Sequence, residues 1–407
     1  MNNIFIKILI LILILVFITA FSSSYSSLNI DNLAYVLAIG IDSSNDNKLE
    51  VSFQFSQPSS PSESGSNKKS KPIINTVTAS SISNAINLIN GYLGKQINMS
   101  HCKVIIFSEE FASKGISDEI YTLINDPQVR PTANIIISKS PAKYYIEQTQ
   151  PQLENLISRY YETFTRSSQY TGYMPHATLA DFYNSLVSKT SEPYTILGGI
   201  NSDDSNNTEN INSQKDYNVK SNNSSVSGKN GSENIGIAVF KHDKLIGELN
   251  ALESISLLTI KNRVNQFMIS VPNYQDNSQY LDIYLTPSTQ TKVKINTKTP
   301  SPFIEINCNF SGRIYSMSEN SKYLSNENLT AISDYCNSYI KNMISDLLYK
   351  TSKEFESDIL DLGRFSLKNF VTIKDFNDYD WKNNYKNSFF KVNVDTSIKS
   401  SMLITES

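Results

Sequence analysis

Four consecutive residues, Ser100 to Lys103, carry side chains that nucleophilic catalysis uses. His101 and Cys102 would supply an imidazole and a thiol. Ser100 and Lys103 have the S-x-x-K spacing of penicillin-recognising enzymes, but the sequence has no K-T-G or S-D-N companion motif. Neighbouring side chains in an extended strand point to opposite faces, so we expect no thiolate–imidazole pair here. We therefore predict that none of these residues is catalytic and that the protein is not an enzyme.

Glycine-rich and acidic runs lack the spacing that phosphate or calcium sites need. The glycines at 198–199 and 228 do not fit the G-x-x-x-x-G-K-[ST] frame that places backbone amides around a phosphate. The adjacent carboxylates at 109–110 and 203–204 do not have the ligand spacing of a calcium loop, and such runs are usually solvated. We expect neither a nucleotide site nor a calcium site.

The chain has only three cysteines, which lie far apart from one another, and three histidines. An odd count of cysteines with no CxxC spacing argues against a disulfide framework and a zinc site, although one pair could still form. We expect the thiols to be small buried hydrophobic groups, because all three lie in apolar-patterned segments. The cysteines are Cys102, Cys308 and Cys336. The histidines, none of which belongs to a catalytic motif, are His101, His176 and His242. The sequence predicts no metal and no cofactor.

Tyrosine and arginine gather on and after one predicted helix that starts near residue 153. These residue types are over-represented at interface hot spots because they bury much area while ordering few torsions. The alternative is a helix whose rings line its own core. The members of this candidate interface are Arg159, Tyr160, Tyr161, Arg166, Tyr170 and Tyr173.

The N-terminus has the pattern of an export signal or a membrane anchor. A charged Lys7 precedes an apolar run from Ile8 to Phe21. Including residues 4–6 brings the run close to the ~20 apolar residues of a spanning helix. Residues 1–26 are thus either a cleaved signal or an uncleaved anchor, and the positive charge keeps the N-terminus in the cytoplasm, so the remaining chain should lie outside it.

Length and charge limit the possible classes of protein. A chain of 407 residues predicts two or three domains. Its 36 Lys and Arg against 39 Asp and Glu give a formal charge of -3, which offers no electrostatic reason to bind nucleic acid. We expect no nucleic-acid partner.

The stretch 28–150 predicts an N-terminal α+β domain. Apolar and alternating residues at 33–41 and 49–55 indicate a hairpin, and helical spacing at 82–93 indicates a helix that Gly94 ends. Further elements are predicted at 104–107 (strand), 116–124 (helix) and 135–137 (strand). The sheet should be mixed, because a hairpin opens it and helices then separate the later strands.

The rest of the chain divides at an Asn- and Ser-rich stretch. Two helical faces predict a helical subdomain over 151–200. Residues 201–234 have hardly an apolar side chain and predict a disordered linker. From 235 to 403 a hairpin, several alternating strands and a long helix at about 325–355 predict a C-terminal α+β domain.

Several blocks of sequence occur in one order along the chain. They are DNLAYVLAIGID at 31–42, HCKVIIFSEE at 101–110, Asn125-Asp126 through Arg130-Pro131, GIAVFKHDKLIGEL at 236–249, and SDIL at 357–360 followed by Gly363 and Trp381. In these blocks the chain resembles the Ger(x)C family of spore germination proteins, the C subunits of nutrient germinant receptors. The resemblance implies an α+β protein of mixed sheets with packed helices and three domains, without enzymatic activity.

The resemblance also implies a cellular location and partner proteins. Members lie on the outer face of the inner spore membrane beside two integral membrane subunits, A and B. They are usually lipoproteins, diacylated on a cysteine right after the signal, but Ser22, Ser23 and Ser24 occupy that place here and Cys102 is the first cysteine. The chain thus has no lipidation residue, and the apolar N-terminal segment would have to hold it at the membrane.

Three functions are therefore compared. The sequence favours a non-enzymatic, membrane-tethered subunit of a germinant receptor that supports receptor assembly and germination signalling. The alternative is an extracytoplasmic solute-binding protein that captures the germinant itself. A secreted cell-wall hydrolase is disfavoured because no acid/base or metal set is present.

Overall fold

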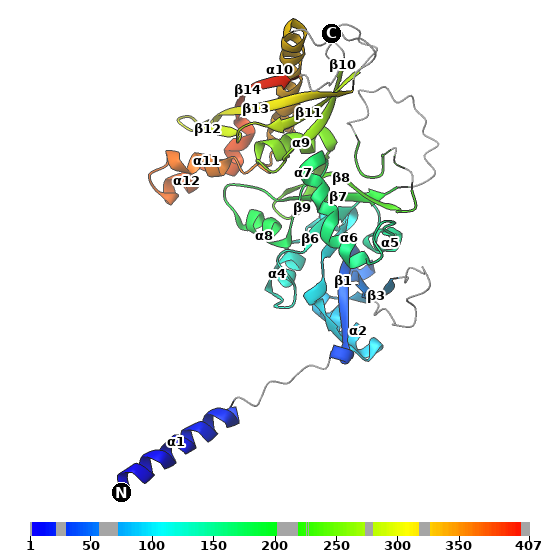
Figure 1. Ribbon diagram of the computed structural model, residues 1–407, viewed down its shortest axis with the longest axis vertical. Helices are drawn as coiled ribbons and strands as arrows, with labels where there is room; N and C mark the ends of the chain where they lie inside the picture. The colour runs from blue at the N-terminus through cyan, green and yellow to red at the C-terminus, as the bar shows by residue number, and fades with distance from the viewer. Residues whose placement is uncertain are drawn as a thin grey trace, which may run out of the picture.

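Two mixed β-sheets with packed helices form the body of the described chain (Figure 1). The computed structural model describes residues 2–21, 30–56, 72–201, 219–224, 226, 228–272, 280–316 and 326–399. The predicted α+β class with mixed sheets is confirmed.

The N-terminal segment forms a helix, α1 (Asn2–Phe21). Its large apolar side chains between Ile4 and Phe17 are each at least half exposed, and they surround the whole helix. Across the described residues, no helix combines the length and apolar character that crossing a bilayer requires.

The first sheet has nine strands in the order β3-β2-β1-β5-β6-β7-β8-β9, with β4 paired to the start of β1. The central strands β1, β5, β6 and β7 are parallel, and antiparallel strands flank them on both sides. The strands are β1 (Leu33–Ser43), β2 (Leu49–Phe55), β3 (Ile73–Ala79), β4 (Gln96–Asn98), β5 (Val104–Ser108), β6 (Asn134–Ser138), β7 (Tyr194–Ile200), β8 (Ser232–Lys241) and β9 (Lys244–Leu249).

The predicted hairpin of β1 and β2 is confirmed, and its turn explains why it forms. Asp46 and Asn47 adopt φ angles of 59° and 55°, a left-handed conformation that Asp and Asn tolerate better than other side chains. Sequence patterns did not predict β3, which extends this hairpin through antiparallel pairing with β2.

Helices cover both faces of the first sheet. One face packs against α2 (Ile82–Leu93), α3 (Glu109–Lys114), α4 (Ser117–Asn125) and α8 (Leu179–Val187). The other packs against α5 (Ala142–Gln148) and α6 (Ile157–Thr163). Each face therefore has its own apolar core, which is why the central strands are apolar almost without interruption.

The domain boundaries predicted from the sequence differ from the sheet pairing. The boundary at residue 235 falls inside β8, which pairs with β7 in the first sheet, and β7 itself lies in the segment predicted as a helical subdomain. Composition cannot reveal this pairing, because it joins residues far apart in sequence.

The predicted disordered linker 201–234 is partly wrong. Ser221 is buried, its amide donates to the carbonyl of Ile235 at 3.0 Å, and its hydroxyl donates to the carbonyl of Leu197 at 2.9 Å. The polar side chains of this stretch are thus used to satisfy the backbone at the end of β7. Residues 202–218 of the predicted linker lie outside the described residues.

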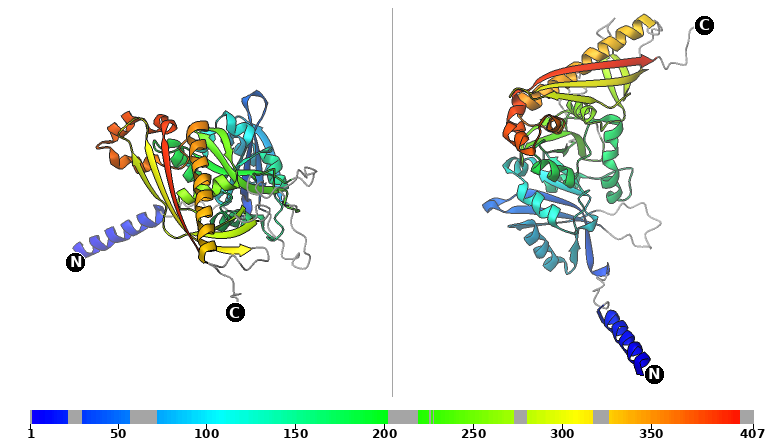
Figure 2. Two further views of the ribbon diagram at one scale, coloured as in Figure 1. Left: turned by 90° about the horizontal axis from the view of Figure 1, so that it is seen from above. Right: turned by 90° about the vertical axis from the view of Figure 1, so that its left-hand side faces the viewer.

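The C-terminal part consists of a five-stranded sheet with α9 (Ala251–Ile260) and α10 (Asn326–Tyr349) packed on one face (Figure 2). Its strands are β10 (Phe267–Pro272), β11 (Tyr280–Pro287), β12 (Lys292–Asn296), β13 (Phe303–Ser316) and β14 (Phe389–Lys399). The predicted long helix ends at Tyr349 and continues as a π-helical turn, Lys350–Glu354. A short helix α7 (Ser168–Thr171) lies between the two sheets, and Tyr173 after it packs on the C-terminal core.

A buried carboxylate holds a lobe of short helices, α11 (Gly363–Ser366), α12 (Ile373–Tyr379) and α13 (Trp381–Asn384). The Asp358 carboxylate accepts from the amides of Leu362 (3.1 Å) and Gly363 (2.9 Å) and from the indole of Trp381 (2.8 Å). A Cβ at Gly363 would lie 2.5 Å from the carbonyl oxygen of Thr190, so only glycine permits this approach. Burial raises the pKa of Asp358 to about 6, and the three donors oppose this shift.

We predict that Asp358→Ala lowers the free energy of unfolding by about 3 kcal/mol, because it leaves three buried donors without an acceptor. Urea unfolding followed by the fluorescence of Trp381 measures the loss. Asp378→Ala, an exposed aspartate in the same lobe, is the matched control and should change stability by less than about 0.5 kcal/mol. Equal effects of the two substitutions would contradict the proposed role of the carboxylate.

Candidate functional site

A crevice lies where the parallel strands of the first sheet end. α3 follows β5 onto one face of the sheet, whereas α5 follows β6 onto the other face. The chain thus leaves two neighbouring parallel strands in opposite directions, which opens a crevice at their carboxyl ends. Ligands of open α/β sheets bind in crevices of this kind.

Asp42, at the end of β1, fixes one wall of the crevice. Its carboxylate accepts from the amides of Ala142 (2.7 Å) and Lys143 (3.0 Å) at the start of α5. Gly40 lets α5 approach β1, since a Cβ there would lie 2.8 Å from a side-chain carbon of Ile146. The first amides of α5 are therefore already satisfied and are not available to an anionic ligand.

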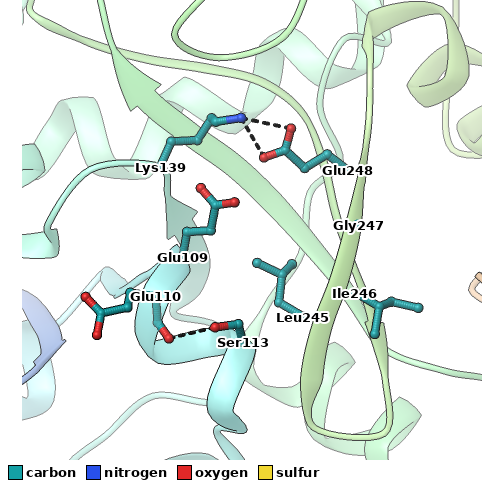
Figure 3. A pocket seen from close by; sticks show the side chains of 8 residues that line it. All are labelled: Glu109, Glu110, Ser113, Lys139, Leu245, Ile246, Gly247 and Glu248. Carbon is teal, nitrogen blue, oxygen red and sulfur yellow. Dashed lines mark hydrogen bonds and ion pairs between the residues drawn. The ribbon is translucent and has the colours of Figure 1, made fainter.

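The crevice contains two adjoining hollows of ≈ 500 Å³ and ≈ 440 Å³ that share Glu109, Glu110 and Lys139. Figure 3 shows the first hollow, in which the ammonium of Lys139 contacts both carboxylate oxygens of Glu248 at 2.8 Å and 3.0 Å. Within the described chain, no cation pairs with the Glu109 carboxylate, which points into the hollow from the start of α3.

Carboxylates outnumber lysines around these hollows. The lining side chains include two lysines, Lys139 and Lys143, and six carboxylates: Asp42, Glu50, Glu109, Glu110, Glu147 and Glu248. A hydrogen bond from Lys114 lowers the pKa of Glu110, so this carboxylate is charged at neutral pH. The lining favours an ammonium group over a phosphate. The described residues contain no group of three or more His, Cys, Asp or Glu side chains placed to hold a metal.

Sequence patterns alone did not reveal this site. Glu109 and Glu110 were considered only as a solvated acidic run, whereas they begin α3 and line the crevice. Lys139 and Glu248 were not singled out, because the sheet order brings together residues that are about a hundred positions apart. The rule that parallel strands share a carboxyl edge is the one signal that could have indicated it, and the sequence analysis did not apply it.

The residues considered for nucleophilic catalysis do not form a reactive set. We predicted extended backbone at His101 and Cys102; Cys102 is extended, but His101 ends a 3-10 turn, Met99–His101. Cys102 is buried, and its thiol donates to the carbonyl of Val104 at 3.5 Å. Lys103 forms an ion pair with Glu162 at 2.6 Å, and the Ser100 hydroxyl donates to Asn98.

The structure divides the candidate interface into buried and exposed members. Tyr161 is 1% exposed in the α6 core, and Tyr160 and Tyr173 are half-buried, so these rings stabilise the fold. Arg159, Arg166 and Tyr170 are exposed, and Arg159 forms an ion pair with Glu154 at 3.4 Å. Sequence spacing could not separate the two groups, because the helix breaks into short α and 3-10 pieces after Thr163.

Comparisons with known proteins match both halves of the chain. The family described as "Spore germination protein N-terminal domain" matches residues 26–198, and "Spore germination B3/ GerAC like, C-terminal" matches residues 235–402. YfkR of Bacillus subtilis (strain 168), a protein named for spore germination, is 24% identical over 205 residues. That alignment covers 49% of this chain and 46% of YfkR, about half of that relative. The crystal structure of the GerBC protein has a similar fold, with a TM-score of 0.51 and 15% identity over 88% of this chain and 96% of that one.

We predict that the native thiols are unreactive in the folded protein. Burial raises the pKa of Cys102 and of Cys336 to about 12 and that of Cys308 to about 11, so the thiolate is scarce at neutral pH. Titration with Ellman's reagent at about pH 8 should be at least roughly a hundredfold slower than in guanidinium. The Ser113→Cys variant, with a thiol at an exposed crevice position, should react rapidly, and a native thiol reacting as fast would contradict the prediction.

Proposed function

Because this chain belongs to the Ger(x)C family of spore germination proteins, we propose that it is a non-enzymatic, membrane-tethered subunit of a spore nutrient germinant receptor. In this role it supports receptor assembly and germination signalling beside the integral membrane A and B subunits. Its body lies on the outer face of the inner spore membrane, to which the N-terminal segment directs it.

The observation that carries this proposal is the apolar surface of α1. A helix that is apolar on every side is stable only when its whole surface is covered. In α1 the side chains of Ile4, Leu9 and Leu13 are each 66% exposed, as is typical of the whole helix. Insertion into lipid would cover this surface, and it would replace the lipid-modified cysteine that the segment after Phe21 lacks.

Contact with the partner subunits requires side chains that are exposed on the surface. Arg159, Arg166 and Tyr170 meet this condition, and all three lie in the segment between β6 and β7. A large aromatic ring beside guanidinium groups is a composition that interface hot spots favour. We assign the assembly surface to these three residues.

We predict that deletion of residues 1–26 releases the protein from spore membranes and removes the A and B subunits from its pull-down. Circular dichroism should show the truncated form folded. In the full chain, Tyr170→Ala should reduce partner recovery without affecting membrane attachment, whereas Tyr315→Ala, at another exposed tyrosine, should not. A truncated protein that stays in the membrane fraction would contradict the tether, and unchanged partner recovery with Tyr170→Ala would contradict the assembly surface.

The crevice favours a second function, capture of a small solute by this subunit itself. Its hollows are large enough for a small molecule, and their excess of carboxylates suits a ligand with an ammonium group. Glu109 would accept from that ammonium, because no cation of the described residues pairs with it.

We predict that the first function holds, so that isothermal calorimetry of the full chain in detergent detects no micromolar binding of amine-containing nutrients. Micromolar binding that Glu109→Gln weakens at least about tenfold would instead favour solute capture at the crevice. Glu119→Gln, at a glutamate outside the hollows, is the matched control and should leave any binding unchanged.

A further inference from the structure

An exposed apolar patch lies at the end of the body where the chain enters β1. Ile73 is 44% exposed, Leu88 49% and Tyr92 75%, and Lys95 beside them is also exposed. We call these four residues the entry patch. β4 follows α2 and pairs with the first residues of β1, which places the end of α2 beside the chain entry (Figure 1).

The patch widens the apolar side of α2 beyond its buried face. That face, with Ile82, Ala85 and Ile89, packs on the sheet. Leu88 and Tyr92 are four residues apart and lie together along its flank, where both side chains are exposed. A surface helix normally buries its apolar stripe, so this exposed flank indicates an apolar or interfacial environment beside the sheet.

Helix caps and strand alternation fix the position of the patch. The Ser81 side chain accepts from the amide of Asn84 at 3.1 Å to begin α2, and Gly94, with a φ of 63°, ends it. Ile73 lies on the same sheet face as Val77, which packs in the core beneath α2. α2 lies against β3 and runs back along it, so Ile73 at the start of β3 and Tyr92 near the end of α2 lie toward the same end of the sheet.

The charge of this region fits an anionic surface. The sequence from 72 to 108 contains no Asp or Glu, but it contains Lys95 and Lys103. Lys103 is paired with Glu162. No ion pair of the described residues includes Lys95, whose ammonium is therefore free to contact anionic head groups.

The chain itself brings the patch close to lipid. Eight residues separate the end of α1 at Phe21 from the first turn of the body at Ile30. A segment of this length spans at most about 30 Å. Once α1 is in the bilayer, as the proposed function requires, the entry patch can reach the head groups. Tyrosine is enriched at that depth because its ring is apolar and its hydroxyl remains hydrated.

We infer that the entry patch rests on the membrane surface, with the ring of Tyr92 among the lipid head groups and Lys95 against anionic lipid. This inference rests on the proposed membrane tether and adds the orientation of the body. The strands of the first sheet then run away from the membrane, and the crevice at their carboxyl ends faces the opposite side.

Fluorescence of a single introduced tryptophan tests this orientation. The chain has one native tryptophan, Trp381, which is 1% exposed and serves as a shielded internal reference. Tyr92→Trp reports on the patch. Tyr144→Trp, at a 45% exposed tyrosine on α5, is the matched control. α5 starts against Asp42, and β1 separates Leu33 from Asp42 by about 30 Å, so Tyr144 lies far from the chain entry.

The full chain is reconstituted into vesicles of phosphatidylcholine and phosphatidylglycerol, with and without brominated acyl chains. Bromine should roughly halve the added emission of Tyr92→Trp and leave that of Tyr144→Trp unchanged. If the chain floats with the vesicles but bromine quenches neither variant, or quenches both, the inferred orientation is overturned and the tether is retained. A full chain that does not float with vesicles would overturn the tether and the orientation together.

Discussion

Backbone hydrogen bonds between β7 and β8 hold the two halves of this protein in one sheet. Thr195 pairs with Ala238 and Ile196 with Ile237, so a strand of the first half is bonded to the first strand of the second half. Separation of the halves would expose a row of amides and carbonyls in the middle of a nine-stranded sheet. The body is therefore built as a continuous unit, although two family domains match it separately.

Buried polar contacts extend this unit to the C-terminal lobe. The Ser357 hydroxyl donates to the carbonyl of Phe240 in β8 at 2.6 Å, and the amide of Glu192 donates to the carbonyl of Asp358 at 2.9 Å. The Glu192 carboxylate in turn pairs with Lys382 at 3.0 Å. The lobe is thus bonded to Glu192, just before β7, and to Phe240, within β8. Both positions lie next to the strand pairing that joins the two halves.

The first sheet carries a different surface feature at each end of its parallel strands. The parallel strands start beside the entry patch and end at the crevice, so the sheet separates the end that carries the entry patch from the end that carries the carboxylate-lined hollows. In the proposed orientation, a tether through α1 and contact of α2 with the membrane would limit how the body can tilt. The crevice and the exposed members of the candidate interface would then remain accessible to other molecules above the membrane.

The sequence by itself determined the features that depend on neighbouring residues. The hairpin of β1 and β2, the helix that Gly94 ends, the buried thiols and the family resemblance all rest on short patterns or ordered blocks. Alternation and helical spacing report burial of local faces, so they identify these elements without knowledge of the fold.

Only the tertiary structure decided which distant segments meet. It placed β7 and β8 in one sheet, ordered the end of the predicted linker through Ser221, and brought Asp42, Glu109 and Glu248 to one crevice. It also buried Tyr161 while leaving Arg166 and Tyr170 on the surface. The physical reason is that strand pairing and side-chain packing depend on long-range complementarity, whereas a single sequence displays only local periodicity and composition.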